Sequence, residues 1–108
     1  MTVKELAQKL NLTFLCEEDP SREISGGYCG DLLSWVMSKA QSGDCWFTVM
    51  GNINCVAVAV LTDCACVVLC ENAPLDEDAK TRAGQQGVNI LQSEESAYSL
   101  SVKLGEIL

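Results

Sequence analysis

The sequence predicts an α/β fold with a mainly parallel sheet flanked by helices. Candidate strands and helices alternate along most of the chain. Residues 65–70 (ACVVLC) are apolar without a break, which is typical of a strand buried on both faces. Residues 51–63 separate two apolar runs and are long enough for a crossover helix between parallel strands. The 108 residues contain no repeat or linker, so we expect a single domain over residues 1–108.

The N-terminal segment predicts a capped helix followed by a strand. Thr2 and Glu5 fit a capping box, and Asn11 can end the helix in a left-handed conformation. Apolar residues recur between them at helical spacing, namely Val3, Leu6, Ala7 and Leu10. Residues 13–16 are a short strand candidate. An acidic loop with a proline follows.

Residues 22–28 predict a second, poorer strand, and Asp31 can cap the helix after it. We expect the core face of that helix to comprise Leu32, Leu33, Val36, Met37 and Ala40. The Ser-Gly-Asp stretch at residues 42–44 ends the helix. Residues 45–50 then form a strong strand candidate, rich in aromatic and β-branched residues.

The stretch NINCVAVAVLTD, at residues 52–63, is ambiguous. Its valines favour a strand, and Gly51-Asn52 could form a hairpin turn. Against this, Asn54 is a good N-cap, and a helix here would connect two parallel strands. We prefer the buried helix.

The C-terminal part predicts a helix, a strand and a final helix. Asp76 opens a helix that ends at Gly87, with a thin apolar stripe of Ala79 and Ala83. Residues 88–91 are the last strand. Ser93 can cap the final helix, whose apolar face comprises Ala97, Leu100, Leu104, Ile107 and Leu108.

Composition limits the possible partners. The net charge is −8 and there is no histidine, so the surface should repel nucleic acid and anionic membranes. Met1 leads directly into a capped helix rather than a basic segment with an apolar run, which indicates no secretory signal. The seven cysteines lie largely inside apolar runs, as expected of reduced, buried thiols in a cytoplasmic protein.

Catalytic, metal and cofactor groups are not evident. There is no histidine base, nucleophile elbow or Walker lysine, so we expect no enzyme and no cofactor. Cys64, Cys66 and Cys70 would share one face of a strand, but no second pair completes a tetrahedral metal site. Cys29 or Cys45 could be a single exposed, redox-sensitive thiol.

The stretch SREISGGYCGD, at residues 21–31, has the layout strand, glycine pair, helix start. That layout fits a phosphate-binding loop, but Asp31 would place a carboxylate where the phosphate binds. Arg22 is the nearest cation, and we expect it to pair with a nearby acid or with the acidic loop at residues 17–19. We therefore interpret Gly26 and Gly27 as a turn with positive φ or as a place of close backbone approach.

The longer stretch SREISGGYCGDLLSWVM resembles the signature region of the DRTGG domain family. The later GDCWFTVMGNINCVAVAVLTDCACVVLCEN is similar to that family's next strand-helix-strand unit. Ser21 stands where the family name has aspartate, which removes one potential partner of Arg22. The resemblance marks Arg22, Gly26, Gly27, Asp31 and Ser34 as signature positions.

The resemblance implies a fold similar to the N-terminal domains of HPr kinase/phosphorylase and of Mur ligases. Such domains accompany CBS domains in some inorganic pyrophosphatases or adjoin phosphotransacetylase, as regulatory and dimerising parts. The resemblance therefore favours a non-catalytic regulatory or interaction module that self-associates and modulates a partner enzyme. The aromatic residues considered for either an interface or the core are Tyr28, Trp35, Trp46 and Phe47.

Two alternatives stay open. The chain could sense a nucleotide or phosphorylated metabolite in a pocket beyond the carboxyl ends of the parallel strands. The tentative ligand-binding residues are Arg22, Gly26, Gly27, Asp31, Ser34, Thr48, Asn52 and Asn54. The chain could also be a thiol-based redox or metal-binding protein.

Overall fold

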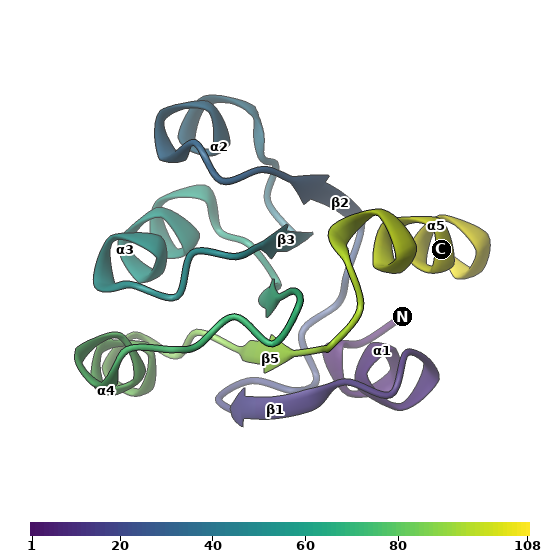
Figure 1. Ribbon diagram of the computed structural model, residues 1–108, viewed down its shortest axis with the longest axis horizontal. Coiled ribbons are helices and arrows are strands. Elements are labelled where there is room, and N and C mark those ends of the chain that lie inside the picture. Colours follow the sequence, from purple (N-terminus) through teal and green to yellow (C-terminus); the bar gives the residue numbers. More distant parts are fainter.

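The computed structural model covers residues 1–108 and forms a five-stranded sheet between two layers of helices (Figure 1). The strand order is β1-β5-β4-β3-β2. The strands are β1 (Thr13–Cys16), β2 (Gly26–Cys29), β3 (Asp44–Thr48), β4 (Cys66–Leu69) and β5 (Ile90–Gln92). Strands β2 to β5 are parallel, and β1 pairs antiparallel with β5. The predicted α/β class and mainly parallel sheet are confirmed.

Five helices cover the sheet unequally. They are α1 (Val3–Lys9), α2 (Leu33–Lys39), α3 (Ile53–Thr62), α4 (Glu77–Gln86) and α5 (Ala97–Ile107). Helices α2, α3 and α4 lie on one face, and α1 and α5 lie on the other (Figure 1). The ambiguous segment 51–63 is a crossover helix, as predicted, and not a hairpin. No helix has the length and apolar character that crossing a membrane requires.

Each face of the sheet has its own hydrophobic core. Trp46 packs on the face of α2 to α4, and its neighbour Phe47 packs on the face of α1 and α5, because successive strand side chains alternate. Both are buried, so they are core residues and not interface aromatics. Strand β4 is buried throughout, as its continuous apolar run predicted. The predicted capping box of Thr2 and Glu5 is also present.

The glycine pair lies inside β2 instead of in a turn. The strand begins at Gly26 and not at Arg22, and neither glycine has a positive φ. The alternative of close approach is correct. A Cβ atom on Gly26 would lie 2.7 Å from Oδ1 of Asp44, and one on Gly27 would lie 3.0 Å from Cδ2 of Leu104. The glycines let β3 and α5 pack against this strand.

Two predicted helix caps are displaced along the chain. Asn52, not Asn54, caps α3, and its Oδ1 accepts from the backbone N–H of Cys55 at 3.0 Å. Ser96, not Ser93, caps α5. A cap must immediately precede the first turn, and periodicity alone does not locate that turn to the residue.

Helix α2 departs most from its predicted packing. Asp31 does not cap it, and the N-cap residue Leu32 makes no capping side-chain hydrogen bond. Val36 is the helix's buried residue, whereas Leu32 and Met37 are exposed. The reason is position: α2 is short and lies over the edge of the sheet, where there is little surface for a wide apolar face to cover. At the end of α5, Ile107 and the following Leu108 are likewise exposed, in contrast to the prediction.

Candidate functional site

Arg22 is held by an acid far away in sequence. Its Nη1 and Nη2 donate to Oδ1 and Oδ2 of Asp63 at 3.0 and 3.1 Å, and Nη2 also donates to the Asp63 carbonyl at 3.1 Å. The Ser42 hydroxyl donates to the same carboxylate. Asp63 ends α3 in a left-handed conformation, so this cluster lies at the amino ends of β3 and β4. Arg22 is therefore paired with an acid, but with Asp63 and not with the acidic loop, and its guanidinium is already engaged.

The ion pair of Arg22 and Asp63 should make the stability of the fold depend on pH. Hydrogen bonds from Arg22 and Ser42 hold the pKa of Asp63 below its ordinary value of 3.8. A lowered carboxyl pKa stabilises the folded state above pH 3.8, and this stability is lost as the pH falls through the folded-state pKa. We expect Asp63→Asn, which tolerates the left-handed conformation, to lower the free energy of unfolding by less than about 1 kcal/mol at pH 7, because the pair is exposed. In urea titrations at several pH values the difference should vanish in strong acid. A difference that persists there would contradict this assignment.

Asp31 and Thr48 form a second polar cluster, at the carboxyl ends of β2 and β3. Oδ1 of Asp31 accepts from the Thr48 hydroxyl at 2.7 Å and from the backbone N–H of Val49 at 2.9 Å. Thr48 is buried, and its Oγ1 in turn accepts from the N–H of Met50 at 3.2 Å. The Asp31 carboxylate therefore ties the turn after β3 to the end of β2.

The eight residues proposed from the sequence do not form one pocket. Arg22 lies at the amino ends of the strands, and Asp31, Thr48 and Asn52 lie at the carboxyl ends. Ser34 and Asn54 are exposed on α2 and α3. The two glycines lie between these ends, within β2.

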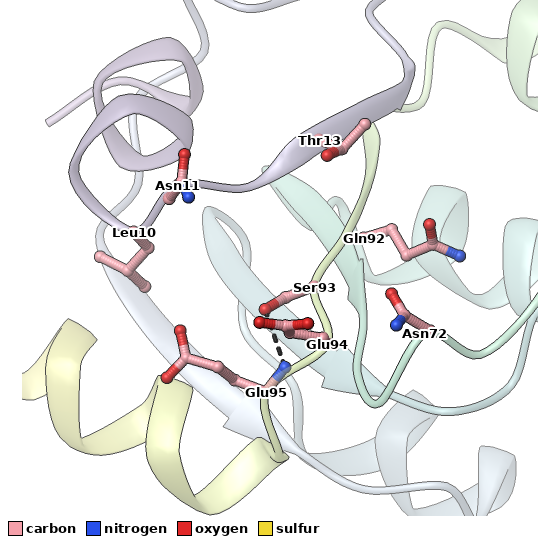
Figure 2. A pocket seen from close by; sticks show the side chains of 8 residues that line it. All are labelled: Leu10, Asn11, Thr13, Asn72, Gln92, Ser93, Glu94 and Glu95. Carbon is pink, nitrogen blue, oxygen red and sulfur yellow. Dashed lines mark hydrogen bonds between the residues drawn. The ribbon is translucent and has the colours of Figure 1, made fainter.

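A polar pocket that sequence reasoning missed lies at the carboxyl ends of β4 and β5 (Figure 2). Its volume is about 220 Å³. It is lined by Leu10, Asn11, Thr13, Asn72, Gln92, Ser93, Glu94 and Glu95. Two of its residues, Asn11 and Asn72, have positive φ values of 56° and 54°. The left-handed conformation of Asn11 was predicted because this residue ends the first helix. No pattern in the sequence indicates that Asn11 lies beside residues 92–95.

An apolar groove runs between β2 and α5. Its volume is about 240 Å³, and it is lined by Gly27, Cys29, Phe47, Ser101, Leu104, Gly105 and Leu108. Sγ of Cys29 lies 2.8 Å from Oγ of Ser101 at its side. The groove follows a strand that has no neighbour on its outer side.

Comparison with known proteins identifies the fold. No family model matches the chain, and no curated protein matches it. A crystal structure of the CBS and DRTGG domains of the regulatory region of Clostridium perfringens pyrophosphatase is similar, with a TM-score of 0.75 over 95% of this chain. The chain has a DRTGG-like fold. The two sequences are 6% identical, so the likeness concerns the fold alone.

The DRTGG-like fold agrees with the resemblance found in residues 21–37. This chain spans 45% of the Clostridium chain, which was crystallised in complex with its activator, diadenosine tetraphosphate. The fold match therefore covers only part of that crystallised regulatory region.

The cysteines of this DRTGG-like domain are free thiols. Five are buried, Cys64 is half-buried and Cys29 is exposed. Cys45 is fully buried, so it is not the exposed thiol considered from the sequence. Burial raises the pKa of Cys55 to about 12 and that of Cys70 to about 11, which keeps both thiols protonated and unreactive at neutral pH. The structure contains no group of three or more His, Cys, Asp or Glu residues placed to hold a metal ion.

Proposed function

We propose that this chain is a non-catalytic regulatory module that self-associates through the outer edge of β2 and, in that form, modulates a partner enzyme. The observation that carries the proposal is an uncharged edge strand with exposed apolar side chains on both sides. The seven free thiols support placement in a reducing compartment such as the cytoplasm.

The outer edge of β2 offers unpaired backbone groups. Gly30 donates its N–H to the carbonyl of Phe47 on β3. Because alternate residues of a parallel strand face the same neighbour, the N–H and C=O groups of Gly27 and Cys29 point away from the sheet. The strand contains no charged residue and no proline, the residue types that usually block edge-to-edge pairing. The opposite edge, β1, has a register irregularity that disfavours such pairing.

Helix α2 adds exposed apolar surface on one side of this edge. Leu32 and Trp35 are 62% and 61% exposed, and their spacing of three places them on one flank. Helix α2 lies beside α3 at the β2 edge of the sheet (Figure 1). Because the buried Val36 faces the sheet, the right-handed turn of the helix places Leu32 and Trp35 on the flank turned away from α3. An exposed tryptophan in this position is a residue type enriched at interfaces.

Helix α5 adds apolar surface on the other side. Tyr98 is 81% exposed and lies two helical turns before Gly105, which lines the apolar groove beside β2 together with Leu108. We call Leu32, Trp35, β2, Tyr98 and Leu108 together the β2 face. A stable interface buries about 800 Å² per partner, roughly one seventh of the 5478 Å² surface of this chain, so both helices must take part.

A second copy of the chain is the occupant that this geometry fits. A two-fold axis at Tyr28 pairs the outward groups of Gly27 with those of Cys29 of the partner subunit, in an antiparallel continuation of the sheet. The same axis brings the exposed apolar side chains of α2 and α5 against their counterparts. The net charge of −8 opposes association elsewhere on the surface but does not involve the strand itself.

Trp35→Ser is expected to weaken self-association by about 2 kcal/mol, about a thirty-fold change, because a tryptophan buried in an interface is a typical hot spot. The measurement is sedimentation equilibrium over a micromolar concentration series. The matched control is Leu61→Ser, at a 71% exposed position on α3 outside the β2 face. A strictly monomeric wild type, or equal effects of the two variants, would contradict the proposal.

Modulation of a partner enzyme is supported by the similar protein, in which domains of this fold belong to the regulatory region of a pyrophosphatase. Its bound activator also motivates the alternative of a nucleotide or phosphorylated-metabolite sensor. The alternative has less support in this chain, because Arg22 is already paired with Asp63 and the eight candidate residues lie apart.

A further inference from the structure

The polar pocket of Figure 2 lies where the topology favours ligand binding. The chain leaves β4 for α4 on one face of the sheet and leaves β5 for α5 on the opposite face (Figure 1). Neighbouring parallel strands whose connections diverge in this way open a crevice at their carboxyl ends, where α/β proteins bind their ligands. Asn72 follows β4 and Gln92 ends β5, so the pocket occupies this crevice.

The pocket wall is held rigidly by the backbone. The N–H of Asn72 donates to the carbonyl of Ser93 at 2.8 Å, and the N–H of Glu71 donates to the carbonyl of Glu95 at 3.0 Å. These two hydrogen bonds join the loop after β4 to the loop after β5. The backbones of these two loops are therefore fixed relative to one another.

Several polar groups of the pocket are uncommitted. The side chains of Asn11, Asn72 and Glu94 make no hydrogen bond within the protein. Ser93 is 8% exposed, and its hydroxyl accepts from the N–H of Glu95 at 3.1 Å, which leaves its own proton to donate. Amide, hydroxyl and carboxylate groups thus converge without satisfying one another.

The charge of the pocket selects its ligand. No lysine or arginine lines it. Glu95 is neutralised by Lys103, whose Nζ lies 2.6 Å from Oε1, and this hydrogen bond together with that from Ser99 lowers the pKa of Glu95. Glu94 has no such partner, so the pocket carries an uncompensated carboxylate. A phosphate group would meet repulsion there, whereas an ammonium group would be attracted.

We infer that this pocket binds a small organic ammonium compound, with the ammonium group at Glu94 and the amide oxygens of Asn11 and Asn72 as further acceptors. Its volume of about 220 Å³ is below the ~300 Å³ at which drug-sized ligand sites begin, so a compact metabolite fits and a dinucleotide does not. The site is on the β5 side of the sheet, away from β2, and is independent of the proposed self-association.

Three probes of equal chain length separate the charge classes: putrescine, 1,4-butanediol and succinate. Each is titrated into the ¹⁵N-labelled full chain at constant ionic strength, and amide shifts are recorded. We expect putrescine alone to shift the amides of residues 11–13, 72 and 92–95 along a saturable curve. Equal or tighter binding of succinate, or putrescine shifts that are absent or spread over the acidic surface without saturation, would overturn the inference.

Variants locate the charge that matters. Glu94→Gln should weaken putrescine binding about three- to five-fold, the range of a partly exposed ion pair. Glu77→Gln, at an exposed acid on α4 outside the pocket, removes the same net charge and should leave the affinity unchanged. Equal weakening by both variants would show that the net charge of the chain, and not this pocket, attracts the dication. Sedimentation of the same samples reports self-association separately.

Discussion

Gly51→Ala is expected to lower the free energy of unfolding by about 3 kcal/mol, because the added Cβ overpacks a backbone contact. Gly51 connects β3 to α3, and a Cβ there would lie within 1.9 Å of the carbonyl oxygen of Pro74. The Gly51 carbonyl also accepts from the N–H of Asp76 at 2.8 Å, so the two backbone segments are held together. The φ of Gly51 is not positive, so only the close contact with Pro74 requires glycine at this position.

Gly84→Ala is the matched control for Gly51→Ala. Gly84 lies within α4, and an added Cβ would meet no atom within 4 Å. Alanine there should raise the free energy of unfolding by about 0.5–1 kcal/mol through its higher helix propensity. Urea denaturation followed by circular dichroism measures both. If Gly51→Ala proved as stable as the wild type, the proximity of residues 51 and 74 would be wrong.

Trp46→Ala is the second large expected effect, a loss of about 3–5 kcal/mol of unfolding free energy. Trp46 is fully buried among α2, α3 and the sheet, and its Nε1 donates to the carbonyl of Gly30 at 2.9 Å. The substitution therefore opens a cavity and also removes the donor to the segment that links β2 to α2. A domain of this size has only about 5–15 kcal/mol of stability, so the variant should be close to unfolding at 25 °C.

Trp46→Phe separates the two contributions. Phenylalanine retains most of the buried ring but cannot donate to Gly30, so its cost should be about 1–3 kcal/mol. Urea denaturation measures the cost of both substitutions. In a separate measurement, hydrogen exchange at the amides following Gly30 should be faster in the phenylalanine variant than in the wild type. An alanine variant that loses less stability than the phenylalanine variant would contradict the assigned packing.

The buried parts of the fold were predictable because burial leaves a strong pattern. The unbroken apolar run of β4 indicated a central parallel strand, and the length of segment 51–63 favoured a crossover helix. Both features depend on many residues at once, so no single side chain decides them. The strands predicted at 13–16, 45–50, 65–70 and 88–91 are all present, with small shifts in their bounds.

Features decided by one residue were less predictable. Asn52 and Asn54 are both good caps, and only the backbone path after β3 selects the first. Aspartate is a typical N-cap residue, but the carboxylate of Asp31 instead accepts hydrogen bonds from the buried Thr48 hydroxyl and the N–H of Val49. Tertiary partners that are distant in sequence decide such choices, and no local pattern contains them.

The candidate sites show the same limit. The motif around Gly26 and Gly27 correctly indicated close backbone approach, because that property belongs to the glycines themselves. The partner of Arg22 was not identifiable, since Asp63 lies 41 residues away. The polar pocket assembles Asn11, Asn72 and residues 92–95, and the sheet order alone brings these three segments together.

Hydrogen exchange at β2, measured as a function of protein concentration, tests the central claim most directly. The amides of Gly27 and Cys29 point outward in the single chain, so they should exchange rapidly at high dilution. As the associated fraction rises, their protection should rise in parallel, while the amide of Tyr28, bonded within the sheet, changes little. Association detected by sedimentation without added protection at Gly27 and Cys29 would contradict the account and place the interface elsewhere.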